Sequence, residues 1–182
     1  MSITKKMDFI PLSPNDLDMI LEWRNAPEVR SKMYTSHEIS LEEHKAWFKR
    51  LKEDKTKAYF LAQLNGKAVG VVGFSEINIV HRIATWAFYT SPNAPRGTGS
   101  LMEYYALEYA FTALKLHKLR CEVLGFNQVV VKLHKKFGFI EEGKHRDAFF
   151  DGQAYHDIVH LGILAQEWEA VKSDLQTKLK LV

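Results

Sequence analysis

Hydrophobic residues along the chain follow two spacings, one typical of half-buried strands and one typical of amphipathic helices. Alternating or short apolar runs predict strands at residues 8–12, 58–64, 67–79, 84–90, 119–124, 139–144 and 154–164. Apolar stripes at helical spacing predict helices at residues 14–25, 40–51, 101–116, 127–137 and 166–179. Ser13-Pro14 begins the first helix, a capping box from Ser40 to Glu43 begins the second, and Gly138 ends the fourth.

The order of these elements predicts a mixed α/β (α+β) fold. Asn65-Gly66 is a preferred hairpin dipeptide, so the strands on either side of it should be antiparallel. The 84–90 strand connects through a long helix to the 119–124 strand, and such a crossover makes two strands parallel. Ligands bind beyond the carboxyl ends of parallel strands, which places the expected site there.

Length and composition limit the class of protein. The chain has 182 residues, 46% of them hydrophobic and 26% charged, as in an ordinary globular protein with one domain. A net charge of +3 is too small for a general nucleic-acid binder, although basic residues gather at 132–136 and 144–146. The single Cys121 excludes an internal disulfide. With a short polar start and no apolar run long enough to span a bilayer, we expect a cytoplasmic protein without membrane contact.

A glycine-containing loop at residues 91–100 lies at the expected ligand-binding end of the sheet. Gly97 and Gly99 allow successive backbone N–H groups to converge, and the start of the next helix adds partial positive charge. Such a loop can bind phosphate, although it can equally be a simple turn. It matches neither the Walker loop nor the dinucleotide-binding fingerprint.

With this loop in its context of strands and helices, the chain resembles the GNAT superfamily of N-acetyltransferases over nearly its whole length. The segment 127–139 is similar to the family's second signature, with His134 where a tyrosine is usual. Ala94 stands where the family has Gln or Arg, with Arg96 nearby. The resemblance implies a mostly antiparallel sheet flanked by helices, the glycine loop between the fourth strand and the third helix, and acetyl-CoA as co-substrate.

Within the superfamily the chain is similar to the bacterial branch of pseudaminic acid biosynthesis, which contributes to flagellin glycosylation. That branch acetylates the 4-amino group of UDP-4-amino-4,6-dideoxy-N-acetyl-β-L-altrosamine. The likeness covers roughly residues 8–168, and the rest of the terminal helix lies beyond it. The segments that carry the likeness are 23–25, 33–35, 38–44, 88–92, 97–99, 106–111, 121–127 and 132–139.

The resemblance assigns roles residue by residue. His134 would protonate the leaving thiolate, and Glu122 would help to deprotonate the amine through water. The residues expected to bind the coenzyme are Tyr89, Arg96, Gly97, Thr98, Gly99, Ser100, Asn127 and Lys132. Those expected to bind the UDP-sugar are Arg24, Met33, Tyr34, His44 and Tyr89. A backbone N–H of the 84–90 strand would stabilise the oxyanion.

Each of these residues also has a structural interpretation. A lone histidine on an apolar helix face is often a core residue, Asn127 serves as a helix N-cap, and Arg24 could form a surface ion pair. His156 and His160 lie too far apart along a strand to bind one metal ion, so no metal is expected. Cys121 should lie on the opposite face of its strand from Glu122, which disfavours a covalent acetyl-cysteine.

Alternative functions remain open from the sequence. One is a peptide or ribosomal-protein N-terminal acetyltransferase, because the segment 23–25 also occurs in that branch. Another is a binding module that senses acetyl-CoA or binds RNA. The leucines of the terminal helix, Leu175, Leu179 and Leu181, would allow a homodimer or would pack on the parent sheet.

Overall fold

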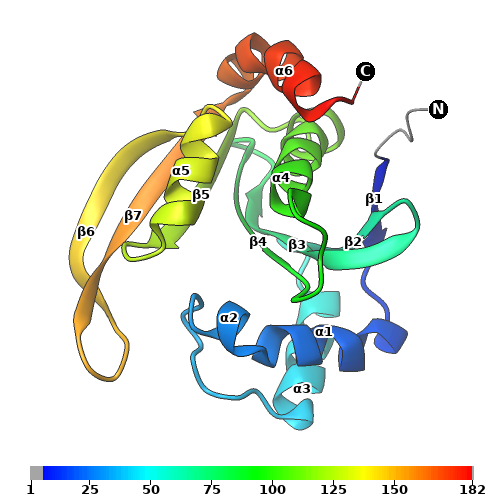
Figure 1. Ribbon diagram of the computed structural model, residues 1–182, viewed down its shortest axis with the longest axis vertical. Helices are drawn as coiled ribbons and strands as arrows, with labels where there is room; N and C mark the ends of the chain where they lie inside the picture. Colours follow the sequence, from blue (N-terminus) through cyan, green and yellow to red (C-terminus); the bar gives the residue numbers. More distant parts are fainter. Residues whose placement is uncertain (1–5, 182) are drawn as a thin grey trace.

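One seven-stranded sheet forms the centre of the computed structural model, which describes residues 6–181 (Figure 1). The strands lie in the order β1-β2-β3-β4-β5-β7-β6. All neighbours are antiparallel except β4 and β5, which are parallel as the crossover predicts. Their bounds are β1 Met7–Pro11, β2 Ala58–Leu64, β3 Lys67–Asn78, β4 Ile83–Thr90, β5 Lys118–Leu124, β6 Ile140–Phe150 and β7 Tyr155–Leu164.

Within residues 6–181, six α-helices surround the sheet, and the five expected helices are among them. They are α1 Leu17–Asn25, α2 Pro27–Arg30, α3 Leu41–Glu53, α4 Thr98–Glu108, α5 Gln128–Lys136 and α6 Ala165–Leu179. A 3-10 turn at Pro14–Asp16 precedes α1, and a π-helical turn at Tyr109–Ala113 follows α4. The capping box of α3 is present, with Ser40 Oγ accepting from Glu43 N at 3.2 Å.

The alternation of side chains along the strands creates two cores, one on each face of the sheet. Phe60 and Val72 belong to the larger core, which α4 covers. Leu61 and Val71, the residues adjacent to these on each strand, belong to the smaller core under α1 and α3. Figure 1 shows these two groups of helices well separated. The face covered by α1 and α3 is therefore available for a site distinct from that of α4 and α5.

Two predicted boundaries are wrong. The long helix begins at Thr98 rather than residue 101, directly after Gly97 at φ +90°, and changes to a π turn before residue 114. β6 continues to Phe150 rather than ending at residue 144. Its residues are almost all exposed at the edge of the sheet, and two register shifts interrupt its pairing with β7, so no apolar alternation marks it in the sequence.

One end of α5 forms as the sequence predicts, and the other does not. Gly138 ends the helix in the left-handed conformation at φ +97°. Asn127 occupies the N-cap position, but its side chain makes no capping bond. The interpretation of Asn127 as a side-chain cap is therefore wrong.

The terminal leucines pack on this chain's own core. Leu175 is buried, and Leu179 and Leu181 lie partly buried against the same cluster. Because these leucines are used within the chain, they no longer argue for a homodimer, which stays a prediction. The single domain spanning 1–182 also stays a prediction, because residues 1–5 and 182 lie outside the described part. Within residues 6–181, every helix is too short or too polar to cross a membrane.

We expect Gly138→Ala to lower the free energy of unfolding by about 1–2 kcal/mol, the cost of a left-handed non-glycine residue. The added Cβ would also lie 3.2 Å from Ile163 Cδ1 and 3.3 Å from Val171 Cγ2. Gly143→Ala is the matched control, because nothing lies within 4 Å of its new Cβ and its backbone is not left-handed. Denaturant unfolding measures the free energy of unfolding of both variants. Equal losses in the two variants would contradict the role of Gly138 as a left-handed helix terminator.

Candidate active site

The parallel strands β4 and β5 separate after three paired residues. Their pairing runs from Ile83 with Lys118 to Thr85 with Arg120 and then stops. Beyond this point β4 stays with β3 as far as Thr90, while β5 stays with β7 as far as Leu124. Each strand therefore turns one edge of backbone N–H and C=O groups toward the gap, where no neighbouring strand satisfies them.

A cleft of about 250 Å³ occupies the gap between the two strands. Its walls are residues 86–90 of β4 and 121–124 of β5. Val130 and His134 of α5 close one side, with Asn127 at the start of that helix. A ligand in this cleft can accept and donate hydrogen bonds along an extended backbone, much as an added strand does.

The glycine loop at the start of α4 offers a phosphate-binding helix terminus. The first intrahelical bond runs from Leu101 N to Gly97 O at 3.2 Å, so the N–H groups of Gly99 and Ser100 precede the helical ladder. The N–H of Thr98 is already bonded to Pro95 O, and its hydroxyl donates to the same oxygen at 2.6 Å. Thr98 thus shapes the loop, and the next two N–H groups are available to an anion.

His134 lies buried at the cleft and is held by a carboxylate that the sequence analysis missed. Its Nδ1 lies 2.7 Å from Oε1 of Glu103, a residue of α4 that is fully buried. The aromatic rings of Trp86, Phe88 and Phe139 surround the imidazole. An imidazole paired with a carboxylate can hold and release a proton at its other nitrogen.

A second polar group faces the cleft from β5. Glu122 is exposed, and its Oε2 accepts from the hydroxyl of Tyr34 at 2.8 Å. Burial and this bond raise the pKa of Tyr34, so the phenol stays protonated. The other oxygen of Glu122 lies 3.6 Å from Nδ1 of His160. Tyr34 therefore lies beside Glu122 in the cleft, rather than in the pocket that holds the other predicted acceptor residues.

That pocket, of about 350 Å³, lies between the sheet and the α1–α3 helices and adjoins the cleft. Arg24, His44 and Tyr89 line it, while Met33, Ala87, Phe88 and Tyr89 line both spaces. Further walls come from Trp47 and Tyr59, whose rings pack edge to face at 5.6 Å. A molecule in the pocket thus meets one in the cleft at residues 87–89.

Two polar atoms of this pocket are fully buried without a partner, Arg24 Nη1 and His44 Nε2. Burial lowers the pKa of both side chains. His44 also stacks on Trp47 with 5.1 Å between the ring centroids. Because buried polar groups are normally hydrogen-bonded, two unpaired ones in a single pocket indicate a site built for a polar ligand.

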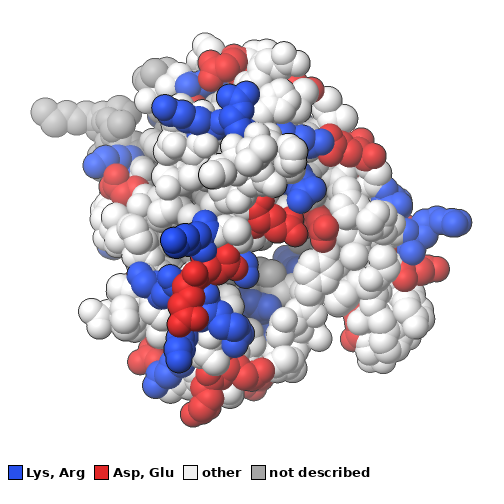
Figure 2. All heavy atoms as spheres, turned by 180° about the vertical axis from the view of Figure 1, so that it is seen from behind, with Lys and Arg blue, Asp and Glu red and all other residues white. Residues whose placement is uncertain are grey.

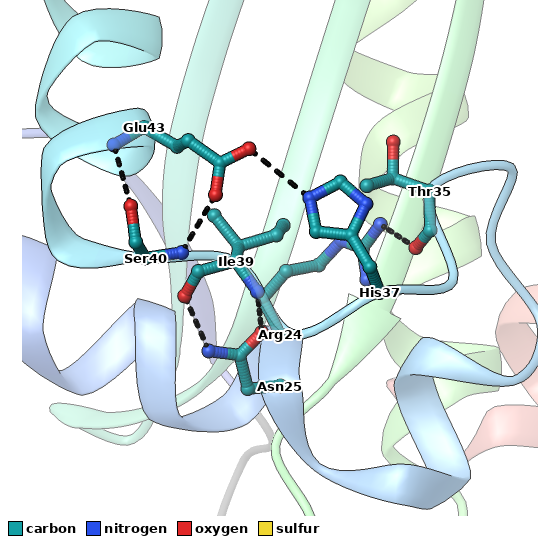
Figure 3. A network of polar contacts seen from close by, with 7 residues as sticks. All are labelled: Arg24, Asn25, Thr35, His37, Ile39, Ser40 and Glu43. Carbon is teal, nitrogen blue, oxygen red and sulfur yellow. Dashed lines mark hydrogen bonds and ion pairs between the residues drawn. The ribbon is translucent and has the colours of Figure 1, made fainter.

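The rim of the pocket is held by side chains that bond to backbone (Figure 3). Arg24 Nη2 donates to Thr35 O at 3.0 Å. The amide of Asn25 bonds both the N–H and the C=O of Ile39, each at 2.9 Å. These contacts tie the segment between α2 and α3 to α1, so Arg24 both faces the pocket and fixes its rim.

Other predicted residues lie apart from these two spaces. Arg96 and Lys132 are exposed and outside the lining of the cleft. On β5, Cys121 is buried while Glu122 is exposed, as the alternation predicts, and burial raises the pKa of the thiol well above its ordinary value. In residues 6–181 no group of three metal-binding side chains comes together.

Charges of both signs are mixed on the face opposite to that of Figure 1. Figure 2 shows Lys and Arg interspersed with Asp and Glu around a hollow in this face. The basic residues noted in the sequence follow this pattern, because Lys135 pairs with Glu141 at 2.6 Å and Lys144 with Asp157 at 3.5 Å. The visible face therefore carries no large surface of one sign.

Comparison with known proteins places this geometry in a family. A model of the acetyltransferase (GNAT) domain matches residues 6–140, which is most of the chain. The chain therefore belongs to the GNAT acetyltransferases and is an N-acetyltransferase that uses acetyl-CoA.

Individual relatives carry the names of different acetyltransferases. Acetyltransferase PseH of Campylobacter jejuni (strain 81-176) is 30% identical over 145 residues, covering 80% of this chain and 90% of that protein. Spermidine N(1)-acetyltransferase of Escherichia coli K12 is 29% identical over 173 residues, covering 93% and 92%. The crystal structure of spermidine N-acetyltransferase from Vibrio cholerae with CoA and spermine matches with a TM-score of 0.83, 26% identity, and coverage of 90% and 98%.

The residues of the cleft fit the coenzyme. Acetyl-CoA supplies an acetyl group activated as a thioester. The unpaired edges of β4 and β5 suit the amides of its pantetheine arm, and the free side chain of Asn127 lies beside them. The N–H groups that begin α4 suit its pyrophosphate.

We expect Gly97→Val to raise the Michaelis constant for acetyl-CoA strongly. A β-branched residue resists the φ of +90° found at Gly97, so the loop would lose the conformation that directs its N–H groups outward. Gly152→Val is the control, because Gly152 has a φ of +99° in the exposed β6–β7 turn. A Michaelis constant unchanged by Gly97→Val would contradict the phosphate assignment.

Proposed function

We propose that this enzyme acetylates the 4-amino group of UDP-4-amino-4,6-dideoxy-N-acetyl-β-L-altrosamine in bacterial pseudaminic acid biosynthesis. The observation that carries the proposal is the pocket beside the cleft, with the buried and unpaired atoms Arg24 Nη1 and His44 Nε2 and with its aromatic walls. The likeness to acetyltransferase PseH supports the pseudaminic acid route. On this proposal the enzyme works in the cytoplasm, and its product serves flagellin glycosylation.

The pocket has the chemistry of a nucleotide-sugar site. A guanidinium N–H donates a charge-assisted hydrogen bond to a phosphate oxygen, and the buried Nη1 of Arg24 is free to do so while Nη2 stays bonded to Thr35 O. The rings of Trp47, Tyr59 and Tyr89 offer faces for uracil, and Met33 offers apolar contact for the methyl sugar.

A polyamine acceptor is the second candidate, favoured by the spermidine acetyltransferase relatives. A polyamine carries several positive charges and needs carboxylates. The pocket instead contains Arg24 and Arg50, and its carboxylate Glu43 is already bonded to Ser40 N and His37. The charge in the pocket thus supports the anionic UDP-sugar.

His134 and Glu122 would carry the proton transfers. The imidazole of His134 would protonate the departing thiolate, and Glu122, through water, would take a proton from the attacking amine. The two side chains line the same cleft from α5 and β5. Tyr34, bonded to Glu122, would orient its carboxylate toward the acceptor.

The coenzyme would be held mainly by backbone. Gly97, Gly99 and Ser100 would present N–H groups to the pyrophosphate, with Thr98 fixing the loop. Asn127 and Tyr89 would contact the pantetheine arm, and Arg96 and Lys132 would reach the phosphates from the surface. A β4 N–H would stabilise the oxyanion.

We expect UDP to raise the melting temperature, because a ligand that binds only the folded state adds about 2.7 kcal/mol of stability at 100 times its dissociation constant. Arg24→Ala should abolish this shift. Arg30→Ala is the matched control, because Arg30 lies outside the pocket lining. Stabilisation by spermidine but not by UDP would favour the polyamine acceptor instead.

We expect His134→Ala to lower kcat by about 10²–10⁴-fold, the usual worth of a positioned acid, with little change in the binding of either substrate. His134→Tyr should recover part of the rate, since a phenol is the superfamily's usual donor. Because His134→Ala leaves Glu103 buried without its partner, its melting temperature should also fall. kcat is therefore measured per folded molecule, and a near-normal value would contradict the catalytic role.

A further inference from the structure

Glu103 is a carboxylate buried in the middle of an otherwise apolar part of α4. Its neighbours Leu101, Met102, Ala106 and Leu107 belong to the main core, and Glu103 itself has no exposed surface. Moving a carboxylate out of water costs several kcal/mol unless partners compensate for the lost hydration. A residue at this position needs a physical reason to be charged.

Glu103 has a single polar partner within the described part of the chain. Oε1 lies 2.7 Å from Nδ1 of His134, while Oε2 is buried and unpaired. Burial raises the pKa of Glu103, and the bond to His134 opposes this rise. Burial therefore disfavours the charged carboxylate, and the bond to the imidazole is the interaction that favours it.

The pairing leaves the other ring nitrogen of His134 facing the cleft. Nε2 has no hydrogen-bond partner among residues 6–181, and it is not fully buried, so it can be reached from the cleft. The ring itself lines the cleft. Trp86, Phe88 and Phe139 pack around it, so its orientation is fixed by aromatic contacts together with Glu103.

We propose that Glu103 is the positioning residue of the reaction: it keeps Nδ1 of His134 protonated, directs Nε2 to the cleft and stabilises the positive imidazolium. This inference rests on the proposed acid role of His134. A carboxylate paired with the remote nitrogen of a histidine is an established way to fix its tautomer.

The proton balance follows from this arrangement. The amine nitrogen bonds to the carbonyl carbon of the thioester, the carbon–sulfur bond breaks, and its electron pair goes to sulfur. His134 gives the Nε2 proton to that sulfur, while Glu122 or water takes the proton lost by the amine. The ring keeps its Nδ1 proton beside Glu103 and regains the Nε2 proton from solvent.

Other titratable groups face the histidine from the elements packed around it. Glu122 and the protonated thiol of Cys121 line the same cleft on β5. On α5 itself, Lys135 and Lys136 are exposed, and Lys135 pairs with Glu141. Within residues 6–181, Glu103 is the charged group bonded to the ring, so its removal should affect the proton transfer most.

The test is Glu103→Gln, which keeps the shape and removes the charge. We expect kcat near pH 8 to fall by about 10²–10⁴-fold, with Michaelis constants for both substrates nearly unchanged.

Glu108→Gln is the matched control on the same helix. Glu108 bonds Trp168 Nε1 at 2.9 Å and Lys172 at 2.8 Å, away from the cleft. This variant should lower stability and leave kcat per folded molecule unchanged. A Glu103→Gln enzyme with the wild-type kcat, or one that loses activity only through raised Michaelis constants, would overturn the proposal.

A double-variant cycle separates a positioning role from a structural one. If Glu103 acts through His134, adding Glu103→Gln to His134→Ala should cost no further kcat. It should also raise the melting temperature above that of His134→Ala, because the unpaired buried charge is gone. Losses in kcat that multiply would overturn the inference.

Nitrogen-15 NMR of the wild-type ring needs neither a variant nor an acceptor. We expect the neutral form of His134 to carry its proton on Nδ1, with Nε2 unprotonated. A ring protonated on Nε2 alone would overturn the inference, even if Glu103→Gln failed to fold. Because no acceptor is present, this result is independent of whether the UDP-sugar is the substrate.

Discussion

The separation of β4 and β5 is the constraint on which the rest of this structure depends. Two parallel strands pair for three residues and then follow different neighbours, β4 with β3 and β5 with β7. The gap exposes backbone groups that a folded protein normally satisfies, and α5 lines it through Val130 and His134. The start of α4 lies close by, because a Cβ at Gly99 would be 3.7 Å from Phe88 of β4 and 3.9 Å from Leu133 of α5. One geometric event therefore brings an extended backbone edge, a helix N-terminus and His134 together.

A second consequence concerns the two faces of the sheet. Alternating side chains support α4 on one face and α1 with α3 on the other, so two separate groups of helices can serve two ligands. The cleft and the neighbouring pocket, which we propose bind the coenzyme and the acceptor, meet at residues 87–89, where β4 lines both. This shared segment explains how an amine and a thioester can be brought together without a large movement of the chain.

The sequence predicts those features that depend on local pattern. Strand alternation, the Asn65-Gly66 hairpin and Gly138 as a helix terminator follow from neighbouring residues, and the crossover follows from element order. Glu103 could not be found in this way, because its partner lies 31 positions away and the surrounding helix appears simply apolar in the sequence. The sequence carried one signal, a carboxylate among the apolar residues 101–107 of this helix. Tyr34 beside Glu122 depends equally on a contact across 88 positions.

Thiol release from acetyl-CoA with different acceptors tests the central claim most directly. The UDP-4-amino sugar, spermidine and an N-terminal peptide are compared at equal concentration on one preparation of the enzyme. The account predicts rapid release with the UDP-4-amino sugar and little with the other two. Release with spermidine that exceeds release with the UDP-4-amino sugar would contradict it, and would assign the pocket beside Arg24 to a polyamine.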